Sequence, residues 1–542
     1  MQRLRAGAAL REPLTLRPPR TTARVAEVVQ LVPPVVTADP RRWRALAVSL
    51  VAGFMTLLDV SIVNVALPSI ARDSGATTAT AQWVVSGYAL TFGLVLIPAG
   101  RLGDAYGRRR MFAIALSAFV LTSAVSGAAP TIGWLIVARL LQGIAGGMVI
   151  PQNSGLVQDL FHGAERGRAF GLLGGVIGLS TATGPVLGGL ILGLSGGPDG
   201  WRWVFYVNVP IGLVALALAA RVLPSGPRGG GRGAHLDLVG SLLLGAGVLG
   251  VLLPLVSSET GGLGRRWWLL ALAVLVLATF GCWEVRTLRR GREPMLDPRL
   301  ARIPGYAPGL AIGLAYFTGS TGIWLVLALF FQEGLGYSPL RSGLAVTPFA
   351  LGAALSAVLA GRAVARVGRR LTVYGLLTVI AGLVATALVL SRVGGNAAAW
   401  AVAGPLLLAG LGSGLVTSPN TTMTLQSIPA GMAGAASGAV QTAQRLGAAT
   451  GTAVLATVFH HAVTSGGGYP TAVSDALSCA AGSMLLALLV SVGELLRRRH
   501  RPEPPAPPLD TATPAAPADR RPGPLPADRL HGLEHLECHH RP

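Results

Sequence analysis

The feature that most constrains this chain is a series of long apolar runs, separated by short segments rich in arginine, glycine and proline. A helix rises about 1.5 Å per residue, so it needs about 20 apolar residues to cross a hydrocarbon core about 30 Å thick. The sequence therefore predicts an all-α integral membrane protein with fourteen transmembrane helices. The predicted spans are 45–67, 83–101, 111–128, 131–151, 168–193, 203–222, 237–256, 267–285, 306–331, 342–361, 371–391, 397–419, 435–460 and 476–496.

Composition excludes two broad classes of protein. Only 12% of the 542 residues are charged, whereas a soluble domain has about 25%. The formal net charge of +21 comes from arginine, since the chain contains no lysine. The arginines punctuate the apolar runs instead of clustering on a polar domain, which favours membrane orientation signals over nucleic-acid binding. This use of arginine is typical of a GC-rich bacterial genome.

Nothing in the sequence indicates a metal, a cofactor or an enzyme. Cys282, Cys479 and Cys538 are too scattered for a disulfide framework or a zinc site. The C-terminal stretch HGLEHLECHH at 531–540 is interpreted as a polar tail in preference to a metal site. Because no phosphate-binding loop or paired catalytic carboxylates are found, ATP drive and catalysis are not expected.

The two ends of the chain differ from its middle. Residues 1–43 are basic and proline-rich without a continuous apolar segment, which predicts a disordered cytoplasmic tail and not a cleaved leader. Residues 498–542 are proline-rich and are also predicted to be disordered. Arginines concentrate after even-numbered spans, as in the run 108–110, so both termini are predicted to face the cytoplasm. We expect a multi-pass protein of the plasma membrane.

An internal repeat predicts the architecture. The segment GRLGDAYGRRR at 100–110 follows the second span, and GRAVARVGRR at 361–370 follows the tenth. The offset of 261 residues covers eight spans, whereas two adjacent six-helix halves would be offset by six. The sequence therefore predicts two six-helix halves, 44–222 and 304–497, with two additional helices inserted at 223–303.

Five motifs in order carry a family resemblance. Besides GRLGDAYGRRR, they are LLDVSIVNVALP at 57–68, ARLLQGIAGG at 138–147, GLSTATGPVLGG at 178–189 and WRWVFYVNVPIG at 201–212. Together they resemble the major facilitator superfamily, in its fourteen-helix drug/proton antiporter branch. The resemblance implies the major facilitator fold. It also implies a proton-coupled secondary transporter that exports a lipophilic drug, antibiotic or natural product by alternating access.

Two charged residues stand inside apolar spans. Burying the Asp59 carboxylate in hydrocarbon favours its protonated form, and proton coupling requires a group that takes up and releases a proton. Arg139 shares a helix face with Gln142 and needs a partner or a water-filled cavity. The resemblance implies proton coupling through Asp59 and Arg139. The alternatives are an aspartate that satisfies a neighbouring helix and an arginine held by backbone carbonyls.

The loop after the second span is predicted to form a conformational latch. An acidic side chain there could hold the next helix through its N-terminal amides or could pair with an arginine. In the second copy of the repeat the acidic position is Ala365, so the latch is asymmetric. A solvated turn with arginines that only set the topology is the alternative. The proposed latch residues are Gly100, Asp104, Gly107, Arg108 and Arg109.

The fifth span has a seam of small residues that lets helices approach closely, with a proline that removes a backbone donor. It resembles the antiporter motif of the family, which implies a sealed, bendable helix interface and favours export. A generic packing seam is the alternative. The motif residues are Gly178, Gly184, Pro185, Gly188 and Gly189.

A substrate cavity is predicted between the halves, although its aromatic residues could equally be packing or lipid-facing, and its arginine could be a counter-ion. Because Asp59 is the only deeply placed carboxylate that the sequence suggests, a neutral, anionic or monocationic lipophilic substrate is expected. The candidate cavity residues are Asn64, Gln142, Tyr316, Trp324, Gln441 and Arg445.

The predicted partners are a lipophilic small molecule, protons and the lipid bilayer, with no nucleic acid and no obligate protein partner. A metabolite importer or exporter on the same fold is the alternative within the class, because fold does not fix function. A transporter-like membrane sensor is the alternative from another class.

Overall fold

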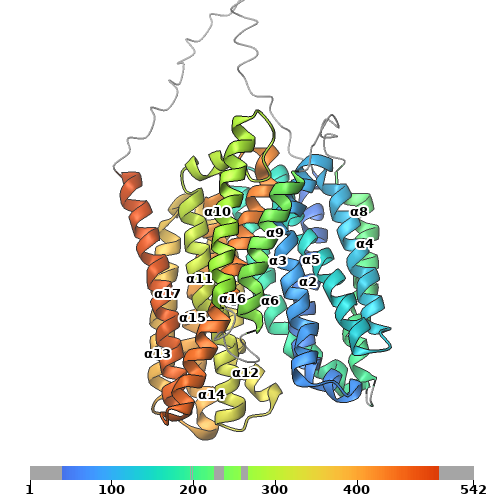
Figure 1. Ribbon diagram of the computed structural model, residues 1–542. Coiled ribbons are helices and arrows are strands. Elements are labelled where there is room, and N and C mark those ends of the chain that lie inside the picture. Colours follow the sequence, from blue (N-terminus) through green and yellow to red (C-terminus); the bar gives the residue numbers. More distant parts are fainter. Residues whose placement is uncertain (1–39, 196, 198, 225–236, 258–266, 500–542) are drawn as a thin grey trace, which may run out of the picture. The chain divides into compact units, whose positions relative to one another are not determined.

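The computed structural model describes residues 40–195, 197, 199–224, 237–257 and 267–499 (Figure 1). By contacts the chain divides into two units, residues 1–496 and 497–542. All the helices discussed below belong to the first unit, apart from the last residues of α17. The two predicted tails lie almost entirely outside the described residues.

Twelve segments of the described chain are long and apolar enough to cross a membrane. The first half provides α2 (Arg42–Ser74), α3 (Thr78–Tyr106), α4 (Arg108–Gly127), α5 (Ile132–Leu160) and the segment Gly200–Val222, which contains α7 (Trp203–Tyr206) and α8 (Asn208–Val222). The others are α10 (Trp267–Arg289), α11 (Tyr306–Leu329), α12 (Pro339–Val367), α13 (Arg370–Leu390), α15 (Ala403–Leu425) with the preceding α14 (Ala398–Ala401), α16 (Ala433–Thr464) and α17 (Gly468–Arg499). The all-α membrane fold is confirmed.

Two further helices correspond to the fifth and seventh predicted spans. They are α6 (Gly163–Ser195) and α9 (Leu238–Ser257), in which the apolar stretches found are the shorter Val186–Ser195 and Val239–Leu255. The count of fourteen spans therefore stays a prediction.

Local sequence explains where several helices begin and end. The side chains of Thr77 and Thr131 accept hydrogen bonds from the backbone amides of the first turns of α3 and α5. Gly107 ends α3 with φ +93°, and Gly368 ends α12 with φ +61°. Because left-handed backbone favours glycine, both copies of the repeated loop need this residue at the same point.

The helix bounds agree with the predicted duplication. α3 and α12 are displaced by 261 residues at both ends, which is the offset of the two loop motifs. α3 packs against α16, and α6 packs against α12. The two halves therefore meet at two seams, and each seam has one helix from each half. The boundaries of the halves at 222 and 303 stay a prediction.

The inserted helices pack against each other, and α9 also contacts α3 and α16 (Figure 1). Their shared core contains Ile97 of α3, Val248 of α9, Phe280 of α10 and Ala439 of α16. The inserted pair therefore lies beside the seam between α3 and α16.

Candidate functional site

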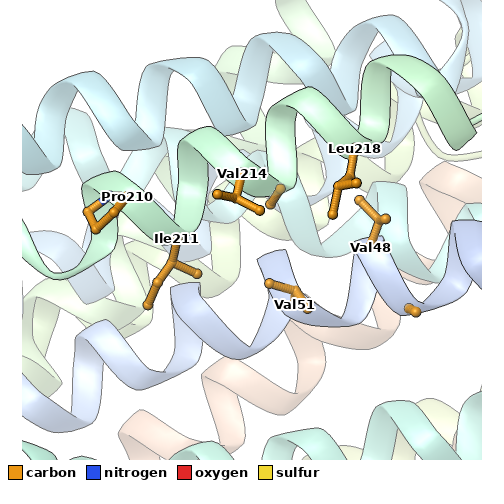
Figure 2. Close-up of a pocket in the computed structure, with 8 residues that line it drawn as sticks. Val48, Val51, Pro210, Ile211, Val214 and Leu218 are labelled. Atoms are coloured by element: carbon orange, nitrogen blue, oxygen red, sulfur yellow. The ribbon is translucent and has the colours of Figure 1, made fainter.

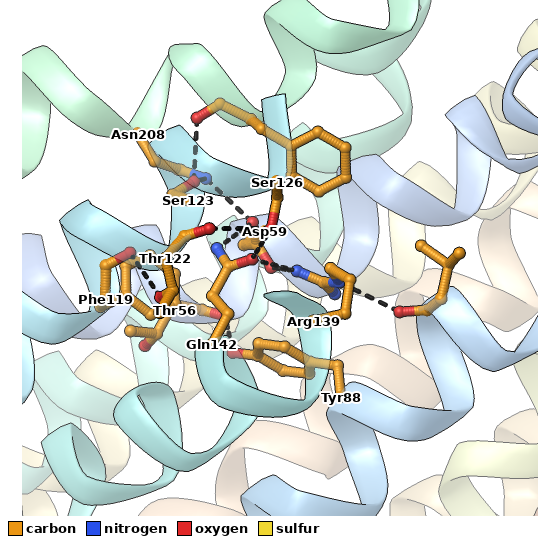
Figure 3. Close-up of polar contacts among 12 residues, drawn as sticks. Thr56, Asp59, Tyr88, Phe119, Thr122, Ser123, Ser126, Arg139, Gln142 and Asn208 are labelled. Atoms are coloured by element: carbon orange, nitrogen blue, oxygen red, sulfur yellow. Dashed lines mark hydrogen bonds and ion pairs between the residues drawn. The ribbon is translucent and has the colours of Figure 1, made fainter. Parts of the chain in front are cut away.

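The two charges that stand out in the sequence form an ion pair inside the first half. Arg139 Nη1 on α5 donates to Asp59 Oδ2 on α2 over 2.5 Å, and both residues are 0% exposed (Figure 3). Isolated charges so far from water would be very costly, so the pairing is what makes their burial tolerable.

Polar neighbours satisfy the remaining lone pairs of Asp59. Its Oδ1 accepts a hydrogen bond from Gln142 Nε2 at 3.1 Å and from Asn208 Nδ2 at 2.9 Å. Asn208 of α8 also donates to Ser123 Oγ of α4 at 3.2 Å, and Ser123 donates to the carbonyl of Phe205. Four helices thus converge on one carboxylate, which we call the Asp59 network (Figure 3).

Arg139 contacts both a carboxylate and a backbone carbonyl, the two kinds of partner that the sequence left open. Besides the carboxylate, its Nε donates to the backbone carbonyl of Val84 over 3.0 Å. Its guanidinium lies 4.2 Å from the ring centroid of Tyr88 and 5.6 Å from that of Phe205. These contacts to a carbonyl and to ring faces remain available when Asp59 is neutral.

Sequence reasoning missed two members of the network. Asn208 carried a signal, because it is an amide within the otherwise apolar end of WRWVFYVNVPIG. Ser123 carried none, since serine is common in membrane helices and can satisfy its hydroxyl on its own helix. Gln142, predicted to line the cavity, is instead fully buried in the network.

The proposed latch residues hold the α3–α16 seam at one end of the bundle, which we call the latch face. Asp104 accepts hydrogen bonds from the backbone amides of Gly434 and Ala435 at 2.9 and 3.0 Å, at the start of α16. Arg108 binds Asp104 at 2.8 Å and Asp159 at 2.5 Å. The carboxylate therefore joins the two halves, and the solvated turn considered from sequence does not describe it.

Glycines allow the two seams to close near this face. A β carbon at Gly100 would collide with the carbonyl oxygen of Gly434, and one at Gly438 would lie 2.5 Å from the carbonyl oxygen of Leu96. In the second seam, a β carbon at Gly361 of α12 would lie 2.5 Å from the carbonyl oxygen of Gly167. Both helix pairs thus approach backbone to backbone.

Arg109 and Gly107 have other roles. Arg109 donates to the carbonyl of Ala220 over 2.5 Å, which ties α4 to the end of α8 within the first half. Gly107 supplies the left-handed turn between α3 and α4.

The second half buries its own arginine at the latch face. Arg369, displaced by 261 residues from Arg108, pairs with Glu494 of α17 at 2.7 Å and donates to Asn420 Oδ1 at 2.5 Å. Glu494 is 7% exposed and Glu284 of α10 is 2% exposed. Both glutamates are thus buried within the protein, but each lies in the last two turns of its helix and not deep in a span.

The small residues of the fifth span serve two different contacts. Gly178 faces the backbone of Ala354 on α12, across the halves. Gly184 and Gly188 instead face Ser61 and Ile62 on α2, within the first half. A β carbon at Gly189 would meet nothing within 4 Å, and the side chain of Pro185 lies outside the described part. The motif is therefore not one continuous seam.

The predicted cavity residues are not gathered in one place. Tyr316 is buried and donates to Ser413 Oγ at 2.7 Å, so it belongs to the core of the second half. Trp324 packs edge-on against Phe349 with centroids 5.0 Å apart. Asn64 is exposed, while Gln441 and Arg445 are half-buried. The guanidinium of Arg445 lies 4.4 Å from the ring centroid of Phe92, and its role in a cavity stays a prediction.

A hollow of about 470 Å³ lies between α2 and α8 (Figure 2). Its lining is apolar, and none of the predicted cavity residues takes part in it. The lining residues are Ala47, Val48, Val51, Pro210, Ile211, Val214, Ala215 and Leu218. The described residues contain no group of three or more potential metal-binding side chains, and the C-terminal histidines lie outside that part of the chain.

Comparisons with known proteins agree with this architecture. The family model of the Major Facilitator Superfamily matches residues 49–452 and 309–525. A probable actinorhodin transporter of Streptomyces coelicolor is 36% identical over 77% of this chain and 72% of its own length. A puromycin resistance protein of Streptomyces alboniger is 38% identical over 78% of this chain and 82% of its own length.

The fold is also found in a solved structure. The crystal structure of a human organic anion transporter superimposes with a TM-score of 0.61 at 16% identity, covering 84% of this chain and all of that chain. From the motifs, the duplicated helices and these matches, the chain belongs to the major facilitator superfamily of membrane transporters, with relatives in its drug-transporter branch.

Proposed function

We propose that the protein exports a lipophilic antibiotic or related natural product across the plasma membrane, in exchange for protons bound at Asp59. The observation that carries this proposal is the fully buried pair of Asp59 and Arg139. Relatives named as an actinorhodin transporter and a puromycin resistance protein support the substrate class.

The pair offers a route from protonation to helix movement. A proton on Asp59 removes the negative charge that Arg139 faces and weakens the hydrogen bonds that Gln142 and Asn208 donate to the carboxyl group. The guanidinium keeps its carbonyl and ring contacts, but its charge is no longer balanced in a low-dielectric site. Movement of α5 relative to α2 towards water or substrate relieves that imbalance.

Alternating access also requires a seal between the two halves that closes and opens, and the seams near the latch face provide it. With both termini in the cytoplasm, as the arginine distribution predicts, the latch face is cytoplasmic, and the state observed is closed on that side. Export requires this closed state to release substrate outward. The latch must then open, which breaks the hydrogen bonds from Gly434 and Ala435 to Asp104.

Arg445 supports a neutral or anionic substrate. It lies half-buried on α16, and no ion pair joins it to a carboxylate in the described part of the chain. Its contact with Phe92 of α3 places a cation and an aromatic face together between the halves. A phenolate, carboxylate or electron-rich ring would bind such a pair.

The test measures export in a pump-deficient bacterium and in proteoliposomes, with puromycin and aromatic polyketide antibiotics as probes. We expect accumulation in cells to fall and to be restored by a protonophore. Asp59→Asn should abolish uphill transport, because an amide cannot exchange a proton. Glu494→Gln is the matched control, since it alters a buried carboxylate outside the Asp59 network.

Three outcomes would each contradict a part of the proposal. Uphill export by a correctly inserted Asp59→Asn variant would remove proton coupling from Asp59. Proton-driven accumulation inside cells would reverse the direction and favour an importer on the same fold. Transport of cationic probes alone, unaffected by Arg445→Ala, would contradict only the substrate class.

A further inference from the structure

The inserted helices carry two carboxyl groups that the proposed transport cycle does not use. Asp237 lies directly before α9, and Glu284 lies near the end of α10. A β carbon at Gly240 would lie 2.6 Å from Asp237 Oδ2 and 2.7 Å from Glu284 Oε1. Both oxygens therefore lie close to the same point beside Gly240. The distance between them is at most the sum of these two distances.

Each oxygen of Asp237 accepts a hydrogen bond. Its Oδ1 accepts a hydrogen bond from the backbone amide of Gly240 at 2.8 Å, which caps the first turn of α9. Its Oδ2 accepts a hydrogen bond from Trp283 Nε1 at 2.7 Å.

Glu284 is in the opposite situation. It is 2% exposed, and its Oε2 accepts a hydrogen bond from the backbone amide of Leu296 at 3.0 Å. Its buried Oε1 accepts no hydrogen bond from the described residues and faces Asp237 Oδ2. An ionised oxygen in that position would be desolvated, unpaired and repelled by a second carboxylate.

Among the residues that the structure describes, no charged group forms an ion pair with Glu284. α9 contributes Asp237, and α3 contributes Arg101, which acts on Glu284 from a distance and forms its ion pair with Glu293. In the following segment, Asp297 pairs with Arg299. The α16 residue in the shared core of the inserted pair is apolar Ala439.

We propose that Asp237 and Glu284 share one bound proton, so that the inserted helices form a protonation site separate from Asp59. The proton comes from solvent and resides on Glu284 Oε1, which then donates towards Asp237 Oδ2. No other bond forms or breaks. Two interacting carboxyl groups of this kind bind and release their protons as a pair.

The site is connected to the latch seam by short contacts. Glu284 binds the amide of Leu296, and the preceding Met295 is buried in the core that Ile97 and Ala439 share. Glu293 in the same segment pairs with Arg101, three residues before Asp104. Loss of the proton would place two negative charges over Gly240 and move this segment against α3.

Infrared difference spectroscopy of the full chain in lipid tests the proposal. Raising the pH from about 5 to about 9, a range in which buried carboxyls titrate, should remove a protonated-carboxyl band in the wild type. Glu284→Gln should lack that band. Asp237→Asn should keep it but lose it at lower pH, since the neighbouring charge is gone. Asp59→Asn should leave it in place. An unchanged band in Glu284→Gln would overturn the proposal.

Thermal unfolding in detergent gives an independent measurement. A proton held only by the folded protein stabilises it at low pH, and this stabilisation is lost as the pH rises through the folded-state titration. The melting temperature of the wild type should therefore fall with rising pH, and Glu284→Gln should flatten that dependence. A sodium-dependent melting temperature without a carboxyl band would show a cation in the site and overturn the shared proton.

Asp237→Asn keeps the proposal testable if Glu284→Gln does not fold. Asp237→Asn keeps an oxygen that can cap α9 through Gly240, so its fold should survive. If Glu284→Gln does not fold, the shift of the band in Asp237→Asn decides the question. A band that titrates identically in Asp237→Asn and the wild type would overturn the proposal.

Discussion

The two halves of the transporter share a scaffold but differ in where they place charge. The first half buries Asp59 of α2 and Arg139 of α5 as an ion pair inside its bundle. The matching helices of the second half, α11 and α15, contain no charged residue at all. Its buried pair, Arg369 and Glu494, lies instead at the latch face. Duplication thus preserved the bundle, while the central charges exist in one copy only.

At the latch face, equivalent arginines in the two copies of the repeat have different partners. Arg108 and Arg369 are displaced by 261 residues, as are their partners Asp159 and Asn420. The first arginine has a second carboxylate, Asp104, where the second half has Ala365. The second arginine is compensated by Glu494 from the last helix. A buried guanidinium needs an anion, but the fold can supply it from different helices.

The largest expected effects separate the two buried pairs. Arg139→Ala and Arg369→Ala should each lower the free energy of unfolding by about 3–5 kcal/mol, because each leaves a buried carboxylate uncompensated. Only Arg139→Ala should also abolish the proton dependence of transport. Thermal unfolding in detergent and transport assays measure the two effects.

A double variant provides the control for this pair of substitutions. Replacing Asp59 and Arg139 together by leucine should recover much of the lost stability, since neither charge remains buried. It should not recover transport. Equal effects of Arg139→Ala and Arg369→Ala on proton dependence would remove the distinction between the halves.

Substitutions at the seams should have intermediate effects. Gly100→Ala should force apart the backbones of α3 and α16, and Gly361→Ala those of α12 and α6, at about 1–3 kcal/mol each. Spin labels at Tyr106→Cys and Ser427→Cys, with the native cysteines replaced by serine, should report a longer distance. Gly245→Ala, which meets no neighbour, is the matched control. Unchanged distances would mean that these glycines do not hold the closed state.

Asp104 and Ala365 test the asymmetry of the latch. Asp104→Ala should cost about 1–3 kcal/mol, because it leaves the amides of Gly434 and Ala435 without their acceptor. The reverse change, Ala365→Asp, introduces an exposed charge and should alter stability by no more than about 0.5 kcal/mol. A large effect of Ala365→Asp on transport would indicate a second latch in a state not observed.

Smaller effects than that of Asp104→Ala are expected at two serines. Ser123→Ala removes the hydrogen bond from Asn208, and Ser413→Ala removes the one from Tyr316, at about 0.5–1.5 kcal/mol each. Ser123→Ala should also shift the pH dependence of transport, because Asn208 positions Asp59. Ser413→Ala should leave it unchanged. The pH profile of export, compared between the two variants, decides whether the Asp59 network extends to α4.

Several features could be predicted because a polar or charged side chain in the hydrocarbon core costs free energy and therefore stands out in the sequence. Apolar runs of membrane length, glycines at left-handed turns and a repeated loop identify the helices and the duplication. Asp59 and Arg139 stand out because each charge would be costly alone. Asp104 was also expected to meet a helix N-terminus, and its partners turned out to be the first amides of α16, 330 residues away.

Other features depend on which side of each helix faces inward. A membrane helix is apolar on all sides, so its sequence gives no pattern that distinguishes a lipid face from a packing face. For that reason the sequence did not indicate that Tyr316 is a core residue, that Gln142 is fully buried or that the fifth-span glycines face two different helices.

The sequence by itself determined the membrane class and the two buried charges of the first half, because both follow from the cost of placing polar groups in hydrocarbon. Its motifs and repeated loop indicated the family and the repeated scaffold. The tertiary structure alone decided that Asn208 and Ser123 complete the Asp59 network, that Glu494 compensates Arg369 and that Asp237 meets Glu284. These pairs lie on different helices. Their formation depends on how each helix is rotated and packed, which local sequence does not specify.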